Sequence, residues 1–334
     1  MKITFYSARS WDERFFNEAL DSASTNRIEP IYQRAALDHH TTALSRGSEA
    51  VCVFVDDTLD QTTLEGLAEA GVKAILLRCA GVNNLDLECA ERLGFFVAHV
   101  PAYSPEAVAE DALALTQTLN RRTHRAFNRV REGNLDLDGL LGVTLHSKTA
   151  GIVGTGRIGL ATARIFQGLG CRVLGYDPTP SEAFDRLGER VSLDTLLAQS
   201  DVISLHCPLT DDTHHLLDER AFSRMKESAM VINTSRGALI DTRAAIEALK
   251  ARRLGALGID VYEQESGLFF RDHSDDIIDD DLFSRLVTLP NVLVTGHQGF
   301  FTVEALEAIA RVTLENLDCY QNDTPCDNAL AGRA

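Results

Sequence analysis

The sequence contains no run of eighteen apolar residues, and positive charge is scarce. The 334 residues include 32 Lys and Arg against 49 Asp and Glu, which gives a formal net charge of −17. A transmembrane helix needs about 20 consecutive apolar residues, and binding to nucleic acid or to an anionic membrane surface needs a basic patch. The sequence therefore predicts a protein that binds neither nucleic acid nor membrane.

Paired cysteines are also missing. The seven cysteines are odd in number and include no CxxC pair, so neither a disulfide framework nor a zinc ribbon is indicated and no metal site is expected. The opening residues, MKITFYSARSWDERFF, place a charged segment after a short apolar stretch. This order is typical of a first strand and not of a secretory signal. We expect a cytoplasmic protein with reduced, buried thiols.

Short apolar runs recur along the chain, and helical periodicity follows each of them. The ten runs are KITFYSA, AVCVFV, KAILLRC, FFVAHV, TAGIVG, RVLGYD, DVISLHC, AMVINTS, GALGIDVY and NVLVTG. Runs rich in Val and Ile, without clean alternation, are typical of strands that helices cover on both faces. The sequence therefore predicts an α/β protein with doubly wound parallel sheets.

The runs fall into two groups, about four in the first hundred residues and six in the later part of the chain. From Pro105 onward, the segment between the groups repeats small and apolar residues at helical spacing, and a second long helical pattern follows the last run. Two such helices can carry the chain from one domain to the other and back. We expect one domain from residues 1–100 and 299–334, and a second from residues 101–298.

The stretch TAGIVGTGRIG is a candidate dinucleotide-binding loop. Gly154, Gly156 and Gly159 have the GxGxxG spacing between a predicted strand and a helical pattern. In this motif the first glycine makes a tight turn, the second lets backbone approach a pyrophosphate, and the third lets helix pack on strand. The helix N-terminus then offers free amides to the phosphates.

The next predicted strand ends at Asp177, eighteen residues after Gly159. A carboxylate at about this spacing binds the adenosine ribose in dinucleotide-binding folds. Because a carboxylate repels a 2′-phosphate, we expect NAD in preference to NADP. The alternative role for Asp177 is a helix N-cap.

Three ionisable residues follow later predicted strands: Arg236 after MVINTS, Glu265 after LGIDVY and His297 after NVLVTG. The carboxyl ends of parallel strands form the ligand crevice of an open α/β sheet. Arginine pairs with carboxylates, and histidine supplies a proton near neutral pH. We expect Arg236 to hold the carboxylate of a 2-oxo acid and His297, oriented by Glu265, to protonate its keto oxygen. Each residue taken alone could instead be a surface or loop residue.

The motifs in combination resemble the D-isomer-specific 2-hydroxyacid dehydrogenases. The resemblance covers essentially the whole chain, from RCAGVNNLDLECAERLG and VPAYSPEAVAE through VGTGRIG, SLHCPLT, INTSRGALID and GIDVYEQE to TGHQGFFT. It implies a Rossmann NAD-binding domain inserted in a flavodoxin-like catalytic domain. The spacing and the insert LFFRDHSDDIIDDDLFSRL most resemble the fermentative D-lactate dehydrogenase branch, which implies NADH-dependent reduction of pyruvate to D-lactate.

The resemblance also implies roles for single residues. Arg236, Glu265 and His297 would be the catalytic trio. The backbone amides of Ala80 and Gly81, with Tyr103, would help Arg236 bind the substrate. The residues that would contact NAD are Gly154, Gly156, Arg157, Ile158, Gly159, Asp177, His206, Cys207, Pro208, Thr213, Thr234, Ser235, Arg236 and Asp260.

Some positions depart from the family pattern. Asp111 follows AVAE where related chains more often carry a histidine or an apolar residue, which affects packing or a subunit contact there. Aromatic pocket residues match only loosely to Phe54, Phe300 and Phe301. The sequence therefore leaves open both pyruvate and bulkier 2-oxo acids as substrates.

The sequence leaves two other functions open. One is a non-enzymatic NAD-sensing binding protein, which the three catalytic side chains disfavour. The other is a dehydrogenase for phosphoglycerate or hydroxypyruvate, for which a basic cluster that would bind a phosphate is missing. The small-residue face of the 105–130 helix suits packing against a symmetry mate, so we expect a homodimer or a dimer of dimers.

Overall fold

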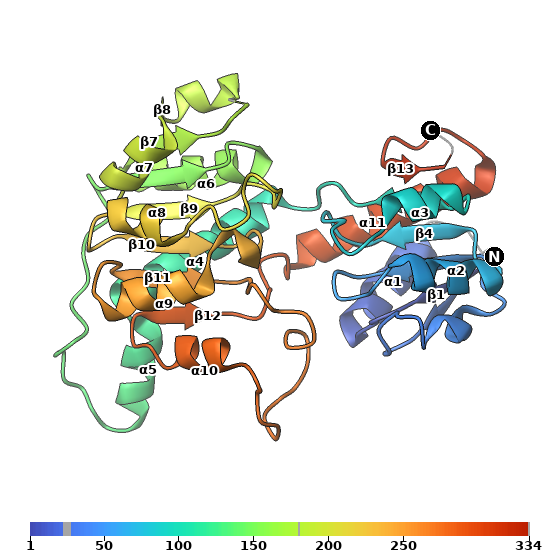
Figure 1. Ribbon diagram of the computed structural model, residues 1–334, viewed down its shortest axis with the longest axis horizontal. Helices are drawn as coiled ribbons and strands as arrows, with labels where there is room; N and C mark the ends of the chain where they lie inside the picture. Colours follow the sequence, from blue (N-terminus) through green and yellow to red (C-terminus); the bar gives the residue numbers. More distant parts are fainter. Residues whose placement is uncertain (23–27, 180, 333–334) are drawn as a thin grey trace. The chain divides into compact units, whose positions relative to one another are not determined.

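The computed structural model describes residues 1–22, 28–179 and 181–332. The chain divides into two compact units, Met1–Ser104 with Phe301–Ala334 and Pro105–Phe300 (Figure 1). The sequence placed the breaks after residues 100 and 298, and the structure places them after residues 104 and 300. Residues 333 and 334, which end the segment predicted for the first domain, lie outside the described residues.

The first unit is built on a six-stranded sheet. Its strands are β1 (Lys2–Phe5), β2 (Glu29–Tyr32), β3 (Ala50–Val53), β4 (Ala74–Leu77), β5 (Phe96–His99) and β13 (Ala329–Ala331). Their spatial order is β13-β5-β4-β3-β1-β2. Strand β13 pairs antiparallel with β5, and the other strand pairs formed by the described residues are parallel. The parallel part has the strand order 2-1-3-4-5 of flavodoxin-like folds, which confirms the predicted fold of this unit.

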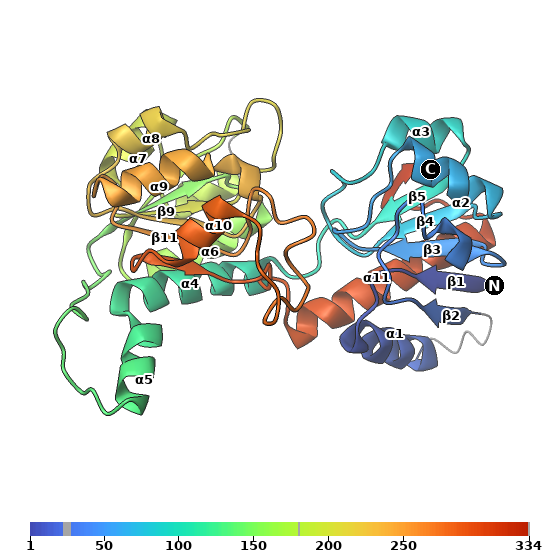
Figure 2. The ribbon, with the colours of Figure 1, turned by 60° about the horizontal axis from the view of Figure 1, so that its bottom comes forward.

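Helices cover both faces of this sheet. They are α1 (Ser10–Ser22), α2 (Gln61–Glu69), α3 (Leu87–Arg92) and α11 (Val303–Asn322). Figure 2 shows α1 and α11 on one face and α2 and α3 on the other. Asp60, Asp86 and Thr302 each accept a hydrogen bond from a backbone N–H in the first turn of the helix that follows, so side-chain caps begin α2, α3 and α11.

A buried arginine ties α1 to the sheet of the first unit. Arg78 follows β4 and is only 1% exposed. Its Nε donates to Asp12 Oδ1 of α1 at 3.1 Å, and one terminal nitrogen donates to the carbonyls of Tyr6 and Ser7 beyond β1. Its guanidinium also lies 4.9 Å from the ring centre of Phe54, beyond β3. The cation therefore holds together the carboxyl ends of three neighbouring strands.

The second unit contains a seven-stranded parallel sheet. Its strands are β6 (Thr149–Val153), β7 (Arg172–Tyr176), β8 (Glu189–Arg190), β9 (Val202–Leu205), β10 (Met230–Asn233), β11 (Ala256–Ile259) and β12 (Val292–Val294). Their order is β12-β11-β10-β9-β6-β7-β8. The chain thus reverses direction across the sheet between β6 and β9, as in a Rossmann fold, and the ligand crevice of such sheets lies at this switch point. This topology confirms the predicted fold of the second unit.

The helices of the second unit lie on both faces of its sheet. They are α4 (Pro105–Arg121), α5 (Thr123–Arg131), α6 (Arg157–Gly168), α7 (Leu193–Gln199), α8 (Glu219–Arg224), α9 (Thr242–Lys250) and α10 (Asp281–Val287). Helices α4 and α6 pack against each other, and α7, α8, α9 and α10 form a second row of neighbours. Within the described ranges, no helix combines the length and the apolar composition that crossing a bilayer requires.

The prediction of one continuous helix over residues 105–130 is wrong. The helix breaks at Arg122, whose backbone is left-handed (φ 51°), and α5 leaves in a new direction (Figures 1 and 2). The break is stabilised from outside the helix. The side-chain amide of Asn120 pairs with both the N–H and the C=O of Val143, at 2.9 Å each.

All ten predicted runs form strands. Strands β2, β8 and β13 were not predicted. All seven cysteines are free thiols, and six of them are buried, which agrees with the expectation of reduced, buried thiols.

We predict that Asp12→Ala destabilises the first unit by about 3–5 kcal/mol, because it leaves the Arg78 cation buried without its ionic partner. The chain has one tryptophan, Trp11, and its ring contacts that of Phe301 in the same unit, with centroids 5.0 Å apart. Urea unfolding followed by tryptophan fluorescence therefore reports on this unit. The exposed Asp21 of the same helix provides the control variant Asp21→Ala. Equal unfolding midpoints for the two variants would contradict the prediction.

Candidate active site

The glycine loop lies between β6 and α6, and each glycine has its own reason to be there. Gly154 has φ 90°, and a Cβ on it would lie 2.6 Å from the carbonyl oxygen of His206. A Cβ on Gly159 would lie 1.9 Å from the carbonyl oxygen of Gly154. Gly156 has no atom within 4 Å of its Cβ position, and as N-cap of α6 it provides no side-chain hydrogen bond to the helix amides. The loop therefore leaves open backbone and free amides for a pyrophosphate, as the motif requires.

Asp177, at the end of β7, is bonded to this loop. Its Oδ2 accepts hydrogen bonds from Thr155 N at 2.7 Å and Thr155 Oγ1 at 3.2 Å. Its other oxygen accepts one from Thr179 N at 2.9 Å. The helical turn that follows begins instead after Ser181, so Asp177 is not its N-cap. A cavity of about 310 Å³ opens beside it, lined by Thr155, Gly175, Tyr176, Asp177, Arg190, Val191 and Ser192.

Two buried polar atoms beside the glycine loop have no hydrogen-bond partner within the described part of the chain. They are Nδ1 of His206, after β9, and Oγ1 of Thr234, after β10. Burial lowers the pKa of His206 to about 3, so its imidazole is neutral. Buried polar atoms in native proteins are almost always hydrogen-bonded, so a bound ligand at this edge of the sheet would satisfy both. Together with the glycine loop and Asp177, these atoms fit a dinucleotide.

The other predicted cofactor residues form the rim of the same edge. Ser235 Oγ donates to the carbonyl of Cys207 at 2.7 Å, which joins the loops after β9 and β10. Thr213 Oγ1 donates to the carbonyl of Pro208 at 2.7 Å and closes the turn after β9. Arg157 and Ile158 begin α6 directly after Gly156. The sheet therefore brings the predicted segments of the second unit together at one edge.

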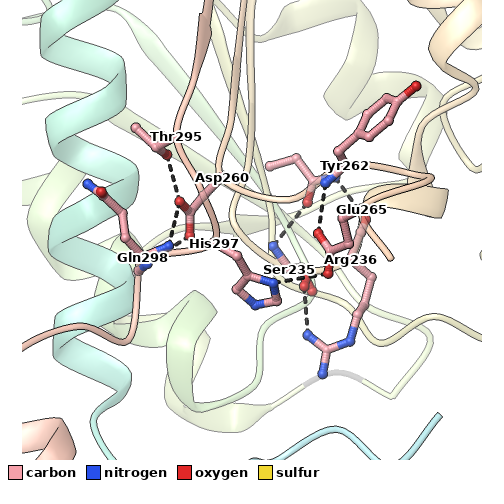
Figure 3. Close-up of polar contacts among 10 residues, drawn as sticks. Ser235, Arg236, Asp260, Tyr262, Glu265, Thr295, His297 and Gln298 are labelled. Atoms are coloured by element: carbon pink, nitrogen blue, oxygen red, sulfur yellow. Dashed lines mark hydrogen bonds and ion pairs between the residues drawn. The ribbon is translucent and has the colours of Figure 1, made fainter. Parts of the chain in front are cut away.

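His297 and Glu265 form a pair. His297 Nδ1 lies 3.0 Å from Glu265 Oε1, and Glu265 Oε2 accepts from Tyr262 N at 3.0 Å (Figure 3). The two side chains are 17% and 26% exposed. With Nδ1 bound to the carboxylate, Nε2 is the ring nitrogen left to meet a substrate. This is the predicted relation between the two residues.

A turn of unusual backbone geometry carries the histidine. His297 has a left-handed backbone (φ 55°), which is uncommon for a residue other than glycine. Asp260, which is 1% exposed, accepts hydrogen bonds from Thr295 Oγ1, Gln298 N and Gly299 N at 2.6, 2.8 and 2.7 Å (Figure 3). Sequence reasoning placed Asp260 at the nicotinamide and missed this anchoring role.

Arg236 begins the turn after β10. Its NH1 donates to the carbonyl of Ser235 at 2.7 Å, and among the described residues no carboxylate forms an ion pair with it. The next residue, Gly237, touches the turn that carries Glu265, because a Cβ on it would lie 2.0 Å from the carbonyl carbon of Tyr262. The guanidinium is therefore available to an anion in the same unit as the histidine and glutamate.

The predicted substrate-binding backbone belongs to the first unit. Ala80 and Gly81 directly follow the anchored segment at Arg78. The Ala80 carbonyl lies 3.2 Å from His99 Nδ1, and the Gly81 carbonyl accepts a bond from the Cys79 thiol at 3.2 Å. Both carbonyls are engaged by neighbouring side chains, which orients the loop. Tyr103 lies near the end of the first part of this unit.

The structure adds one residue that sequence reasoning missed. The ring of Phe270 lies 5.6 Å from that of His297. Phe270 also has a left-handed backbone (φ 61°), which is a true outlier for so bulky a residue. It belongs to the insert after Glu265, and strained residues of this kind cluster at functional sites. No local sequence pattern predicts the strain. The two adjacent phenylalanines of the insert are the sequence feature that could have drawn attention to this position.

The Asp111 carboxyl group of α4 faces the histidine turn. A Cβ on Gly299 would lie 3.3 Å from Asp111 Oδ2 and 3.2 Å from Asp260 Oδ2, so the two carboxyl groups are neighbours. Asp111 Oδ2 is buried and has no hydrogen-bond partner among the described residues. Burial, and then repulsion by Asp260, raise the pKa of Asp111 to about 7.

Comparison with known proteins now identifies the family. Residues 113–299 match the family model described as D-isomer specific 2-hydroxyacid dehydrogenase, NAD binding domain. The chain belongs to the D-isomer-specific 2-hydroxyacid dehydrogenases. Its cofactor is NAD, and the family model covers most of the second unit, which holds the glycine loop.

Individual relatives are similar over nearly their whole length. The chain is 58% identical over 331 residues to a D-lactate dehydrogenase of Curvularia clavata, which covers 99% of this chain and 95% of that protein. It is 51% identical over 331 residues to the D-lactate dehydrogenase of Escherichia coli strain K12, covering 99% and 100%. The apo-structure of D-lactate dehydrogenase from Escherichia coli superposes with a TM-score of 0.90 at 48% identity, covering 99% of this chain and 100% of that one.

We predict that Asp111→Asn makes the protein more stable relative to wild type as the pH rises. With a folded pKa of about 7 against an ordinary 3.8, folded Asp111 binds its proton more tightly than the unfolded chain does. The free energy of unfolding of the wild type therefore falls between these two pH values, and asparagine removes that loss. Thermal unfolding of both proteins at about pH 5 and about pH 8 measures the difference. A difference of the same size at both pH values would count against it, and exposed Asp275→Asn is the control.

Proposed function

We propose that this enzyme catalyses the reversible, NADH-dependent reduction of pyruvate to D-lactate. One observation carries the proposal: at the carboxyl edge of an NAD-binding sheet, an imidazole paired with a carboxylate lies in the same unit as an arginine that has no ionic partner among the described residues. The D-lactate dehydrogenases of Curvularia clavata and Escherichia coli, at 58% and 51% identity, support pyruvate as the 2-oxo acid.

Each side chain has a role that its surroundings favour. The planar fork of Arg236 binds the substrate carboxylate and polarises the keto group. His297 donates a proton from Nε2 to the developing alkoxide, while Glu265 fixes the tautomer and stabilises the imidazolium. The backbone amides of Ala80 and Gly81, with Tyr103, contribute to carboxylate binding from the first unit. When bound, NADH supplies the hydride that reduces the keto carbon.

We assign the two units the roles expected from the sequence, with substrate binding in the first and NAD binding in the second. The ring of Phe270 against His297 favours a small substrate, because it occupies space beside the proton donor. A dehydrogenase for bulkier 2-oxo acids is the second candidate, since the family as a whole acts on D-2-hydroxy acids. The free, mostly buried cysteines support a cytoplasmic location.

We also propose that the enzyme is a homodimer formed through α5 and the segment after it, residues 132–143. This part of the second unit extends away from the sheet (Figures 1 and 2) and exposes six large apolar side chains: Phe127, Val130, Leu135, Leu137, Leu141 and Val143. A monomer rarely exposes so many together. The helix carries three arginines and the segment three acidic residues, so the surface is complementary to a second copy of itself.

The first test of the reaction is steady-state kinetics over a panel of 2-oxo acids with NADH and NADPH, with the chirality of the product determined. We expect the highest kcat/KM with pyruvate and NADH, and D-lactate as product. His297→Ala should lose about 10²- to 10⁴-fold in turnover while NADH binding, followed by fluorescence titration, is unchanged. Arg236→Lys should raise the KM for pyruvate, because an ammonium cannot form a bidentate pair.

Exposed Arg220→Lys is the matched control for the arginine. Near-normal turnover of His297→Ala would remove the histidine from the mechanism. Higher kcat/KM with a branched or aromatic 2-oxo acid would favour the second candidate.

The homodimer predicts a mass of twice the chain mass by light scattering after size exclusion. Replacing Leu137 and Leu141 together by Asp should give monomers, because charge then enters the apolar contact. Replacing exposed Leu44, which lies in the other unit, provides the control. A wild-type protein that is monomeric at all concentrations would end the proposal.

A further inference from the structure

A group of metal-ligand side chains lies in the second unit, outside the residues assigned to the reaction. His214, His215 and Glu263 each offer a ligand atom, and these atoms lie within 4.8 Å of one another. It is the one group of this kind found in the described ranges. The imidazole rings of the two histidines are stacked with centroids 3.9 Å apart, and His215 Nε2 lies 2.6 Å from Glu263 Oε1.

The surrounding backbone orients two of the three ligands. The second oxygen of Glu263 accepts a hydrogen bond from Thr242 N, in the first turn of α9, at 3.2 Å. His215 has a left-handed backbone (φ 51°), and its N–H donates to the carbonyl of Ala238 at 2.8 Å. Backbone strain in a non-glycine residue persists only where the surroundings enforce it. Solvent still reaches the group, since the His215 and Glu263 side chains are 32% and 21% exposed and His214 is more exposed.

We propose that His214, His215 and Glu263 bind one divalent transition-metal ion of the Zn²⁺ class. Two imidazoles and one carboxylate are a ligand set that Zn²⁺ and its neighbours prefer, and three protein ligands leave a fourth position for water. Mg²⁺ and Ca²⁺ require mainly oxygen ligands, of which the group offers one carboxylate. The ordinary role of such a group is a hydrogen bond between two loops, and the His215–Glu263 contact fills that role when no ion is bound.

A second pair of adjacent histidines in the chain shows what the third ligand adds. His39 and His40 also stack, with ring centroids 3.7 Å apart, in the first unit. No acidic side chain completes a three-ligand group around them among the described residues. The two pairs therefore differ by one carboxylate, which makes the His39–His40 pair a matched control.

The ion would act on the two turns that carry the catalytic side chains, an effect that rests on the proposed function. Glu263 lies two residues before Glu265 in one turn, and Ala238, bonded to His215, lies two residues after Arg236 in the other. The backbones of the two turns are already in van der Waals contact at Gly237. Zn²⁺ holds nitrogen and oxygen ligands at about 2.0–2.2 Å, so its binding must open the His215–Glu263 contact and shift these turns. Bound Zn²⁺ therefore lowers turnover.

Binding is tested without any activity, by isothermal titration of the chelator-treated full-length protein with zinc chloride. One ion per chain is expected in the wild type and in His40→Ala. His214→Ala should bind at least about tenfold more weakly, since loss of even an outer partner of a metal ligand costs about 10- to 100-fold. His214 is exposed, so this variant should fold, and its thermal unfolding checks that. Equal affinity of wild type and His214→Ala, or no binding by the wild type, would overturn the site.

The variant Glu263→Gln tests the contribution of the carboxylate to metal binding while both imidazoles stay in place. Its amide oxygen can still accept from Thr242 N, so the start of α9 keeps its hydrogen bond while the anionic ligand is lost. Weaker Zn²⁺ binding by this folded variant supports the three-ligand site, and unchanged binding rejects the carboxylate as a ligand.

The effect on turnover is a separate measurement. Zn²⁺ should inhibit the wild type and His40→Ala, but not His214→Ala, at the same concentration, and a chelator should restore activity. Binding without inhibition would keep the metal site and reject its coupling to the two turns. A protein that binds Zn²⁺ but reduces no 2-oxo acid would instead reject the proposed function.

Discussion

The site in the second unit depends on one buried carboxylate. Asp260, at the end of β11, accepts three hydrogen bonds from the turn that follows β12, and its own carbonyl accepts a fourth from His297 N at 2.7 Å. A left-handed backbone in a residue other than glycine costs about 1–3 kcal/mol, and these bonds offset it. Without them, nothing in the local sequence would hold the imidazole against Glu265.

The same carboxylate shapes the electrostatics around the histidine. The chain has a net charge of −17, yet it must bind an anionic substrate. Surface charges farther apart than about 8 Å are largely screened at physiological ionic strength. The charged groups close to the site therefore determine whether an anion binds there. Arg236 is cationic and has no ionic partner among the described residues, and burial beside Asp260 raises the pKa of Asp111 to about 7. Below this pKa, protonation of Asp111 keeps a second negative charge away from the histidine turn.

Much of this arrangement could be predicted from local patterns. Nine of the ten apolar runs became interior strands, because interior parallel strands are buried on both faces and need continuous apolar sequence, and the tenth became the edge strand β12. The glycine spacing predicted the loop for an equally local reason, since Gly154 and Gly159 lie where a Cβ would meet backbone. The pairing of Glu265 with His297 followed from topology, because parallel strands place their carboxyl ends at one edge.

The features that could not be predicted depend on partners far away in the sequence. The short edge strands β2, β8 and β13 have two to four residues and no long apolar run. The helix break at Arg122 is set by the contact of Asn120 with Val143, and the sequence around it has no proline or glycine. The strain at Phe270 and the anchoring by Asp260 likewise arise from tertiary packing.

Both units use a buried charge after an interior strand to hold a loop at the ligand edge, but the two charges have different partners. In the first unit, Arg78 has an ionic partner in Asp12 and lies beneath the loop that contains Ala80 and Gly81. In the second, Asp260 is surrounded by neutral N–H and O–H donors. When one partner of a buried ion pair is removed, the other charge stays buried without compensation. A carboxylate held by neutral donors keeps its full negative charge, so it can raise the pKa of a neighbour such as Asp111. Both charges also act on neighbouring carboxyl groups: burial raises the pKa of Asp57 to about 6 and the Arg78 cation opposes that shift, whereas Asp260 adds to the burial that raises the pKa of Asp111 beside the histidine turn.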